Sequence, residues 1–468
     1  MKKKNVIRYA REFASIAATY GLDLLSSLLI SLVLPVFVSV DCYANVKTYL
    51  MYVVYVSLVN FGFNDGMYIK YGKYDYNELP YGEFKRYLFH ISIVEVPFIV
   101  LMAAAGVIFP NMFGREMAIV LAINIFFVNT NGFFNFINQF TKRFSLNLKN
   151  NSISKVIQFV ILFILIINGT DNWVLYVSAM TLCTAINCML NTWRNLNILK
   201  APIMPYGSAK NNIVDCYKAG ISVMVGYYAV QLITTASQLS IRYTASTEIF
   251  AYYSFAFSIM NFINVFVNST STCLYPNVKR LGEDRRQDAF EIVAVAGIFL
   301  TSICFLFVPL INYLIILLIP KYTDSTIYIR ILFPIVLTNG ISKAVAANIY
   351  KIYRIEDQYM RRTVVTATAA IILVLLVVVL TSNSYILAGV AVLNTFINMV
   401  VMLQGIRKYL HHGGLRFIVG YALVVLISYY IAMVIDIDFL NYLLFVIVIV
   451  VAGCIGLIRE RRMLIKGD

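Results

Sequence analysis

Residues 63–79, FNDGMYIKYGKYDYNEL, interrupt a chain that is otherwise dominated by apolar runs. The stretch follows the apolar run 46–62 and contains four tyrosines, two lysines and three acidic residues. Aromatic rings and snorkelling lysines suit the headgroup layer of a membrane. We therefore interpret this stretch as an interfacial loop after a membrane-spanning helix, in which Gly66 and Gly72 permit turns.

The composition of the whole chain is typical of a polytopic membrane protein. Of the 468 residues, 60% are hydrophobic and only 13% are charged, with a mean hydropathy of +0.78. Apolar runs of about 20 residues, long enough to cross a hydrocarbon core of roughly 30 Å, recur along the sequence. The expected fold is all-α. Because no A-x-A-like cleavage site follows the basic start MKKKNVIRYAR, we expect the first helix to remain as an anchor.

Apolar runs and the breakers between them predict fourteen membrane-spanning helices. The expected spans are 13–38, 46–62, 87–109, 117–138, 153–168, 172–190, 216–241, 247–274, 289–318, 327–350, 363–381, 384–404, 415–435 and 439–458. With the N-terminus inside, the inner segments hold 32 of the 38 lysines and arginines, as the positive-inside rule requires. Both termini are therefore predicted to be cytoplasmic, in the cytoplasmic membrane.

The longest gap between spans divides the predicted helices into two bundles. We expect a six-helix bundle over 1–190, a cytoplasmic linker over 191–215, a second bundle over 216–404, and two C-terminal helices with a basic tail over 405–468. SLVNF in the second helix is echoed by SIMNF in the eighth, where a parallel repeat would place it.

Several function classes find no support in the sequence. The net charge of +15 is spread over short loops and forms no basic domain, so we expect no nucleic-acid partner. The seven cysteines form no CxxC pair, and we expect neither a metal site nor a cofactor. Walker A, GxGxxG, HExxH and GxSxG motifs are absent, and the three histidines (90, 411 and 412) form no cluster with acids. We therefore do not expect an enzyme.

Polar side chains recur at helical spacing within several predicted spans. Lipid cannot satisfy amides, so these faces point to other helices or to a water-filled cavity. For a single asparagine we favour helix-to-helix hydrogen bonding, and for the set we favour the wall of a transport path. The candidate path residues of this kind are Asn124, Asn131, Asn135, Asn261, Asn264, Asn268, Gln231, Gln238 and Asn339.

Ionisable residues inside the spans are few. Lys343 shares a face with Asn339 and is expected either to meet an anionic substrate or to form a structural ion pair. Arg242, at an outer helix end, is a second path candidate, with snorkelling to the surface as the alternative. Asp23 and Glu95 are candidate sites for a coupling H⁺ or Na⁺, and the alternative for each is a structural hydrogen bond or a neutral acid.

Two stretches give the sequence a family resemblance. FGFNDGMYIKYGKYDYNEL (61–79) after the second predicted helix, and EIFAYYSFAFSI (248–259) at the start of the eighth, resemble the Wzx-type flippases of polysaccharides and lipid-linked oligosaccharides. These flippases belong to the multidrug/oligosaccharidyl-lipid/polysaccharide exporter superfamily. The resemblance implies two six-helix bundles in a MATE-like V, with two further helices outside it. It also implies translocation of a polyprenyl-pyrophosphate-linked oligosaccharide by alternating access, for surface polysaccharide biosynthesis.

The resemblance assigns roles to particular residues. Asp65, Tyr68, Lys70 and Tyr71 match the family stretch after the second helix and are candidates for a cytoplasmic entrance. Expected partners are the lipid-linked glycan, membrane lipids and glycan polymerase machinery. The chain departs from relatives in lacking an arginine within its first two helices, so a cationic cavity rests mainly on Lys343.

Three alternatives stay open from the sequence. A cation-coupled drug or metabolite exporter of the same fold would need a committed acidic site, for which Asp23 and Glu95 are available. A membrane-embedded polymerase or acyltransferase of the same pathway would need a long external loop or a cluster of His and acids, and neither is visible. A scaffold without transport activity would leave the polar faces without a use.

Overall fold

The computed structural model describes residues 25–110, 114–279, 282–411 and 413–434, with two isolated positions at 447 and 451. Every regular element in these ranges is helical, which confirms the predicted all-α membrane fold. Contacts between residues divide the chain into two compact units, residues 1–228 and 229–468. The boundary falls inside one long helix, α11 (Tyr206–Thr244), whose first part belongs to unit 1 and whose second part belongs to unit 2.

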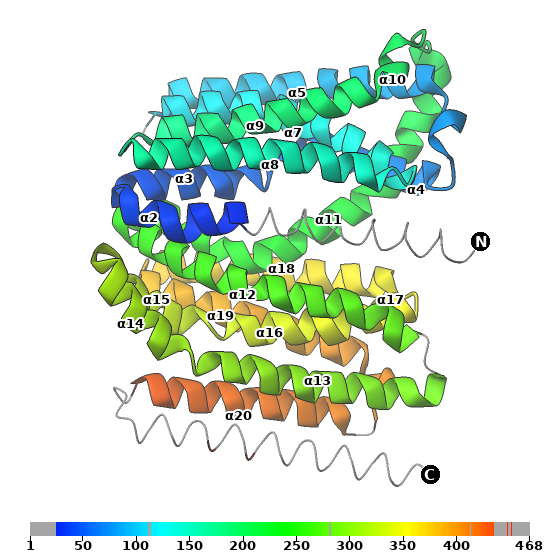
Figure 1. Cartoon of the computed structure of the whole chain (residues 1–468). Coiled ribbons are helices and arrows are strands. Elements are labelled where there is room, and N and C mark those ends of the chain that lie inside the picture. The colour runs from blue at the N-terminus through cyan, green and yellow to red at the C-terminus, as the bar shows by residue number, and fades with distance from the viewer. Residues whose placement is uncertain are drawn as a thin grey trace, which may run out of the picture. The chain divides into compact units, whose positions relative to one another are not determined.

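Unit 1 is built around the helices α5, α7, α8 and α9, which lie side by side in Figure 1. Its elements are η1 (Leu29–Val33), α2 (Leu34–Phe37), α3 (Val40–Val53), η2 (Val56–Asn60), α4 (Phe63–Tyr71), η3 (Tyr76–Glu78), α5 (Tyr81–Ile108), α7 (Arg115–Phe140), α8 (Phe144–Ile167), α9 (Trp173–Arg194), α10 (Leu196–Lys200) and the first part of α11. The stretch expected as a linker, 191–215, thus contains α10 and the start of α11.

In unit 2, α16 packs against α12, α13 and α19, while α18 packs against α19 and α20 against α13. Its elements after α11 are α12 (Thr247–Lys279), α13 (Glu283–Phe305), α14 (Val308–Leu318), η4 (Pro320–Tyr322), α15 (Ser325–Leu332), α16 (Ile335–Ile341), η5 (Ser342–Ala346), α17 (Ala347–Ile352), α18 (Glu356–Leu380), α19 (Ser384–Gly405), η6 (Arg407–Tyr409) and α20 (Gly414–Val434). Within the described residues, η1 and η5 are π-helical turns.

Ten helices within the described residues are long and apolar enough to cross a membrane, and an eleventh span forms if the bent pair Val40–Asn60 and Phe63–Tyr71 is one segment. The predicted span 87–109 corresponds to α5 and the span 384–404 to α19. The first predicted span, 13–38, is described only from residue 25, and the predicted helix 439–458 lies outside the described residues.

Prolines explain two breaks that the hydropathy pattern did not predict. The expected helix 289–318 consists of α13 and α14, and Pro309 occupies the first turn of α14, where a missing N–H does no harm. The expected helix 327–350 is divided between α15 and α16 at Pro334. A proline inside a helix removes a hydrogen bond and clashes with the preceding turn, so the helix bends or breaks there.

The structure corrects the interpretation of residues 63–79 as a loop. After η2 the chain turns through Phe61 and Gly62, which both have positive φ (48° and 78°), and Asn60 Oδ1 accepts a hydrogen bond from the Gly62 N–H. Residues 63–71 then form the helix α4, bent by 59° from the preceding segment. The turn needs a residue that tolerates left-handed backbone, and Gly62 supplies it without a Cβ penalty.

A close backbone contact joins α4 to α11. A Cβ on Gly66 would lie 1.7 Å from the carbonyl oxygen of Cys216, and a Cβ on Gly220 would lie 1.9 Å from that of Gly62. Gly66 is therefore a packing glycine inside a helix, and its predicted role in a turn is wrong. Gly62 and Gly66 are four residues apart, the spacing at which small residues let two membrane helices approach closely.

Alanine at this contact tests how much of unit 1 depends on it. Gly66→Ala and Gly220→Ala each place a methyl group against backbone that has no room to move, so we expect each to destabilise the protein by about 1–3 kcal/mol. Gly207→Ala is the control on α11, because nothing lies within 4 Å of its new Cβ. Thermal unfolding of the purified protein in detergent measures the effect. Wild-type melting of Gly66→Ala would contradict this account of the contact.

Candidate functional site

Unit 1 holds a buried cation, Lys47, in the helix α3. Its Nζ donates a hydrogen bond of 3.0 Å to Ser31 Oγ and lies 5.3 Å from the centre of the Tyr43 ring. No carboxylate in the described part of the chain forms an ion pair with it. A buried ammonium is unfavourable without a partner or water, so this group is suited to receive an anion.

Lys47 is not among the candidates from the sequence, because the predicted span 46–62 places it at a helix end. In the structure α3 begins at Val40, so Lys47 lies about 10 Å along the helix from its start. Ser31, which accepts its hydrogen bond, belongs to the π-helical turn η1. Such turns occur frequently at functional sites. The preceding residues 40–46, VDCYANV, include Asp41 and Asn45, so hydropathy gave no signal that Lys47 lies inside a helix.

On another side of α3, hydrogen bonds connect three helices through Tyr49. The Tyr49 hydroxyl lies 2.6 Å from Thr181 Oγ1 on α9 and accepts a hydrogen bond from the Asn124 amide on α7. All three side chains are buried within unit 1. Asn124, predicted to line a transport path, is thus engaged in a contact between helices.

An amide network centred on Asn191 ties α7, α8 and α9 together. Asn191 is fully buried and takes part in five side-chain hydrogen bonds with other asparagines, at 2.7 to 3.4 Å. Its amide donates to Asn131, Asn135 and Asn187 and accepts from Asn138 and Asn150. Asn131 and Asn135, two further path candidates, therefore participate in helix-to-helix bonding, the alternative that the sequence left open for single asparagines.

Glu95 on α5 is the least satisfied polar group of unit 1. Its side chain is fully buried, and neither carboxyl oxygen has a hydrogen-bond partner among the described residues. Such a carboxyl group neutralises itself by holding a proton, because an isolated buried carboxylate is far too costly. Its predicted role as a site for a coupling H⁺ or Na⁺ stays a prediction. The other predicted ion site, Asp23, lies outside the described residues.

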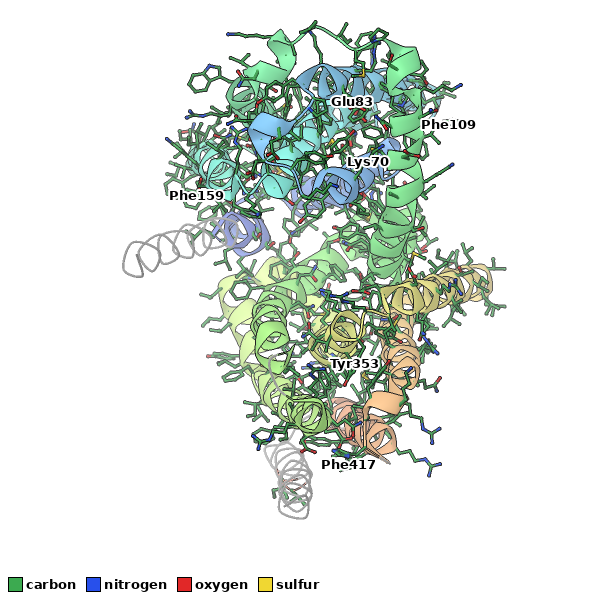
Figure 2. The ribbon with its side chains drawn as sticks, turned by 90° about the vertical axis from the view of Figure 1, so that its right-hand side faces the viewer. Lys70, Glu83, Phe109, Phe159, Tyr353 and Phe417 are labelled. Carbon is green, nitrogen blue, oxygen red and sulfur yellow. The ribbon has the colours of Figure 1, made fainter. Side chains whose placement is uncertain are left out.

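The predicted entrance residues lie on α4, where Lys70 joins this helix to α11. Its Nζ donates to Asn212 Oδ1 at 2.7 Å and pairs with Asp215 Oδ2 at 3.1 Å. The Asn212 amide in turn donates to the buried carboxylate of Glu83 on α5. Figure 2 labels Lys70 and Glu83, which lie in the same unit. The chain of contacts makes Lys70 a structural link between α4 and α11.

The tyrosines of the opening stretch divide into exposed and packed groups. Tyr68 is exposed, as expected for the headgroup layer, whereas Tyr71 is buried and its hydroxyl lies 2.8 Å from that of Tyr87. Asp65 is half-buried. In the following turn, burial raises the pKa of Tyr76, which the Arg143 guanidinium, 3.8 Å from the ring centre, partly offsets. Of the four tyrosines, Tyr71 is thus buried, Tyr74 and Tyr76 are half-buried, and Tyr68 is exposed.

In unit 2 the central cation is Lys343, which is half-buried in the π-helical turn η5. The turn continues from α16, which carries the half-buried Asn339, and contacts α12 and α19. Both π-helical turns of the described chain thus involve a lysine: η5 contains Lys343 and η1 contains the hydrogen-bond partner of Lys47. A π turn inserts one residue into a helix and redirects the side chains beside it.

The other candidates of unit 2 do not converge on one group of contacts. Gln238 donates to Ser254 at 3.2 Å, while Arg242 lies 5.7 Å from the Phe250 ring centre. The remaining described candidates on α11 and α12 are the half-buried Gln231, the exposed Asn261 and the buried Asn264. The side chain of Asn268 lies outside the part of the structure that is described.

The Asn191 network makes a prediction about stability. Asn191→Ala removes five amide hydrogen bonds, so at about 0.6 kcal/mol each we expect a loss of up to about 3 kcal/mol. Asn197→Ala is the matched control, because this asparagine on α10 is exposed. Thermal unfolding in detergent compares the two. Equal melting temperatures would mean that the network contributes nothing measurable.

The burial of Glu95 makes a spectroscopic prediction. If the carboxyl group holds a proton at neutral pH, the infrared spectrum contains a carboxylic-acid C=O stretch that disappears in Glu95→Gln. Because glutamine is a neutral isostere, we also expect the variant to unfold within about 0.5 kcal/mol of the wild type. A carboxylate band in the wild type at neutral pH would show that the group is ionised and has a partner.

Comparisons with known proteins show a shared fold. No protein-family model matches the chain, and no curated protein sequence matches it either. Among solved structures it is similar to the lipid II flippase MurJ in an inward closed conformation, with a TM-score of 0.69 and 12% identity over 97% of this chain and 100% of that one. It is also similar to an inward-facing multidrug resistance MATE family transporter of the MOP superfamily, with a TM-score of 0.59 and 13% identity over 83% of this chain and 94% of that one.

At these identities the likeness shows the fold and leaves the substrate open. Both similar proteins are transporters or flippases and not enzymes. The resemblance to Wzx-type flippases thus agrees with the comparisons at the level of the superfamily fold. The chain is a multi-pass membrane protein with the fold of the MOP-type transporters and flippases.

Proposed function

We propose that this chain is a flippase that moves a polyprenyl-pyrophosphate-linked oligosaccharide across the cytoplasmic membrane by alternating access, for surface polysaccharide biosynthesis. The fold shared with a lipid II flippase supports the class of activity. The observation that carries the proposal is the buried Lys47 of unit 1, which no described carboxylate neutralises. A pyrophosphate is the anion that a lipid-linked sugar would bring to it.

Lys343 is proposed as the second cation of the path, because it occupies a π-helical turn in unit 2. Each unit then supplies one ammonium group from within its helices. Lysine binds phosphate as a point charge and tolerates several orientations of the ligand. That property suits a group that is bound in one conformation of the transporter and released in another.

A cation-coupled drug exporter is the second candidate, supported by the similarity to a MATE transporter and by Glu95, which has no hydrogen-bond partner among the described residues. The buried Lys47 argues against a cationic drug, because like charges repel each other strongly at low dielectric. In the proposed flippase Glu95 serves as a proton site for coupling.

We further propose that both termini are cytoplasmic, that the helices form two six-helix bundles with two C-terminal helices outside them, and that glycan polymerase machinery is a partner.

Lys47→Met separates a role in transport from a role in folding. Removing a buried charge with one hydroxyl partner should leave stability unchanged or increase it, because a hydrophobic residue of similar volume avoids the desolvation penalty. Losing a charge-assisted contact to pyrophosphate, worth about 1.5–3 kcal/mol, should lower translocation roughly 10- to 100-fold. Proteoliposomes loaded with a fluorescent polyprenyl-pyrophosphate oligosaccharide measure the transport rate.

Lys149→Met is the control, because Lys149 is an exposed lysine of unit 1 at the start of α8. Lys343→Met should behave as Lys47→Met does. If Lys47→Met translocates the lipid at the wild-type rate, this lysine does not contact the pyrophosphate and the proposal loses its main support. Export of a cationic dye by the wild type, without translocation of the lipid, would favour the drug exporter.

A further inference from the structure

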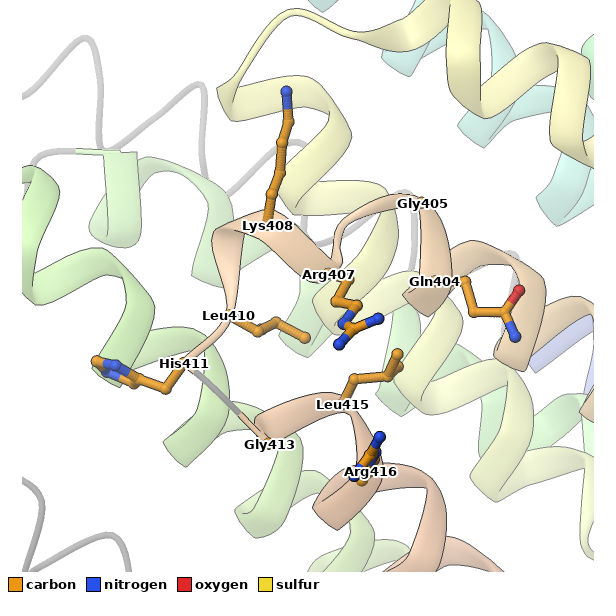
Figure 3. A pocket seen from close by; sticks show the side chains of 9 residues that line it. All are labelled: Gln404, Gly405, Arg407, Lys408, Leu410, His411, Gly413, Leu415 and Arg416. Atoms are coloured by element: carbon orange, nitrogen blue, oxygen red, sulfur yellow. The ribbon is translucent and has the colours of Figure 1, made fainter.

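A basic hollow of about 600 Å³ lies in unit 2 where α19 ends and α20 begins. Figure 3 shows that Arg407 and Arg416 point into it from either side of Leu415, whereas Lys408 and His411 point away. The residues that line the hollow include no acid; they are Gln404, Gly405, Arg407, Lys408, Leu410, His411, Gly413, Leu415 and Arg416. A hollow of this size can hold a small ligand or a lipid headgroup.

Contacts with α13 hold the walls of this hollow in place. His411 donates its backbone N–H to Glu291 Oε1 at 2.8 Å, and its ring nitrogen Nε2 lies 2.5 Å from Asp288 Oδ1. A Cβ on Gly414 would lie 1.9 Å from the same Glu291 oxygen, so α20 begins directly against this buried carboxylate. The segment between α19 and α20 is thereby attached to α13 at both the side chain and the backbone of His411.

The two acids near the hollow do not neutralise its arginines. Asp288 and Glu291 both bond to His411, whose ring points away from the hollow. The side chains of Arg407 and Arg416 are exposed, and their guanidinium groups form no hydrogen bond or ion pair with any other described residue. Two guanidinium groups that face each other without an anion repel, so this arrangement favours a ligand with negative charge and several acceptor oxygens.

We propose that this hollow binds the phosphate headgroup of an anionic membrane phospholipid. The position supports a lipid, since α19 and α20 are both long and apolar enough to cross a membrane and the hollow lies between the end of one and the start of the other, where headgroups are expected. This end is the one that the positive-inside rule predicts to be cytoplasmic, where anionic lipids and basic pockets between helices meet. Leu410 and Leu415 supply an apolar surface for the glycerol and the first methylenes of the acyl chains.

The proposed lipid site does not depend on the transported substrate, because it uses neither Lys47 nor Lys343, the two lysines assigned to the path. A free phosphate would offer the same oxygens to the two arginines. A phospholipid differs in also using the leucines and in being confined to the membrane, which raises its local concentration. The experiment must therefore compare lipid with soluble anion.

The test measures phospholipid binding to the purified full-length protein by native mass spectrometry, in detergent micelles doped with phosphatidylglycerol or with phosphatidylcholine. Wild type should retain phosphatidylglycerol in preference to phosphatidylcholine. The double variant Arg407→Gln/Arg416→Gln should bind phosphatidylglycerol roughly 30-fold more weakly. Each arginine near the membrane surface contributes about 1 kcal/mol of binding free energy, and about 1.4 kcal/mol corresponds to a tenfold change in affinity. Melting in phosphatidylcholine alone verifies that the variant is folded.

Lys351→Gln/Arg361→Gln is the matched control, because it removes the same charge from exposed residues at the same predicted face but outside the hollow. Its affinity for phosphatidylglycerol should equal that of the wild type. An equal loss in both double variants would assign the binding to diffuse surface charge and overturn the proposal. Wild-type affinity in the arginine variant would overturn it directly. Displacement of the lipid by inorganic phosphate at equal concentration would identify a soluble anion as the ligand instead.

Discussion

The need to satisfy polar groups away from water governs how the helices of unit 1 meet. Hydrocarbon provides no hydrogen-bond partners, so each amide or hydroxyl at membrane depth has to find one on a neighbouring helix or at a bound ligand. Asn191 meets five other amides, and Tyr49 joins α3 to α7 and α9. These bonds set the rotation of each helix about its axis, because a turned helix would leave several of them unmade.

Close backbone packing complements this hydrogen bonding. The bend at Gly62 directs α4 toward α11, and the missing side chains of Gly66 and Gly220 let the two backbones touch. Lys70 then reaches Asn212 and Asp215 on α11. Residues 63–71 of the opening stretch are therefore a helix that packs against α11 in unit 1, and its Lys70 and Tyr71 side chains bond to other helices.

The proposals about function rest on charged or ionisable side chains that lack a neutralising partner among the described residues. Lys47 has a hydroxyl and an aromatic ring but no described carboxylate, and Glu95 has no described partner at all. At the membrane surface, Arg407 and Arg416 face the same hollow without an acid. In the functions proposed for them, each of these groups is stabilised by something from outside the chain: an anion, a proton or a lipid headgroup.

The sequence by itself determined the class of the protein and the approximate position of most helices, because hydrophobic length follows directly from the thickness of the membrane. Hydropathy did not predict the helix break at Pro334, because it averages over many residues. The sequence also could not distinguish a glycine in a turn from a glycine packed inside a helix, as Gly66 shows. Only the tertiary structure decided that Gly66 meets Cys216 and that Lys47 is buried. Such outcomes depend on which helix faces meet across 150 residues of sequence, and local patterns contain no information about that pairing.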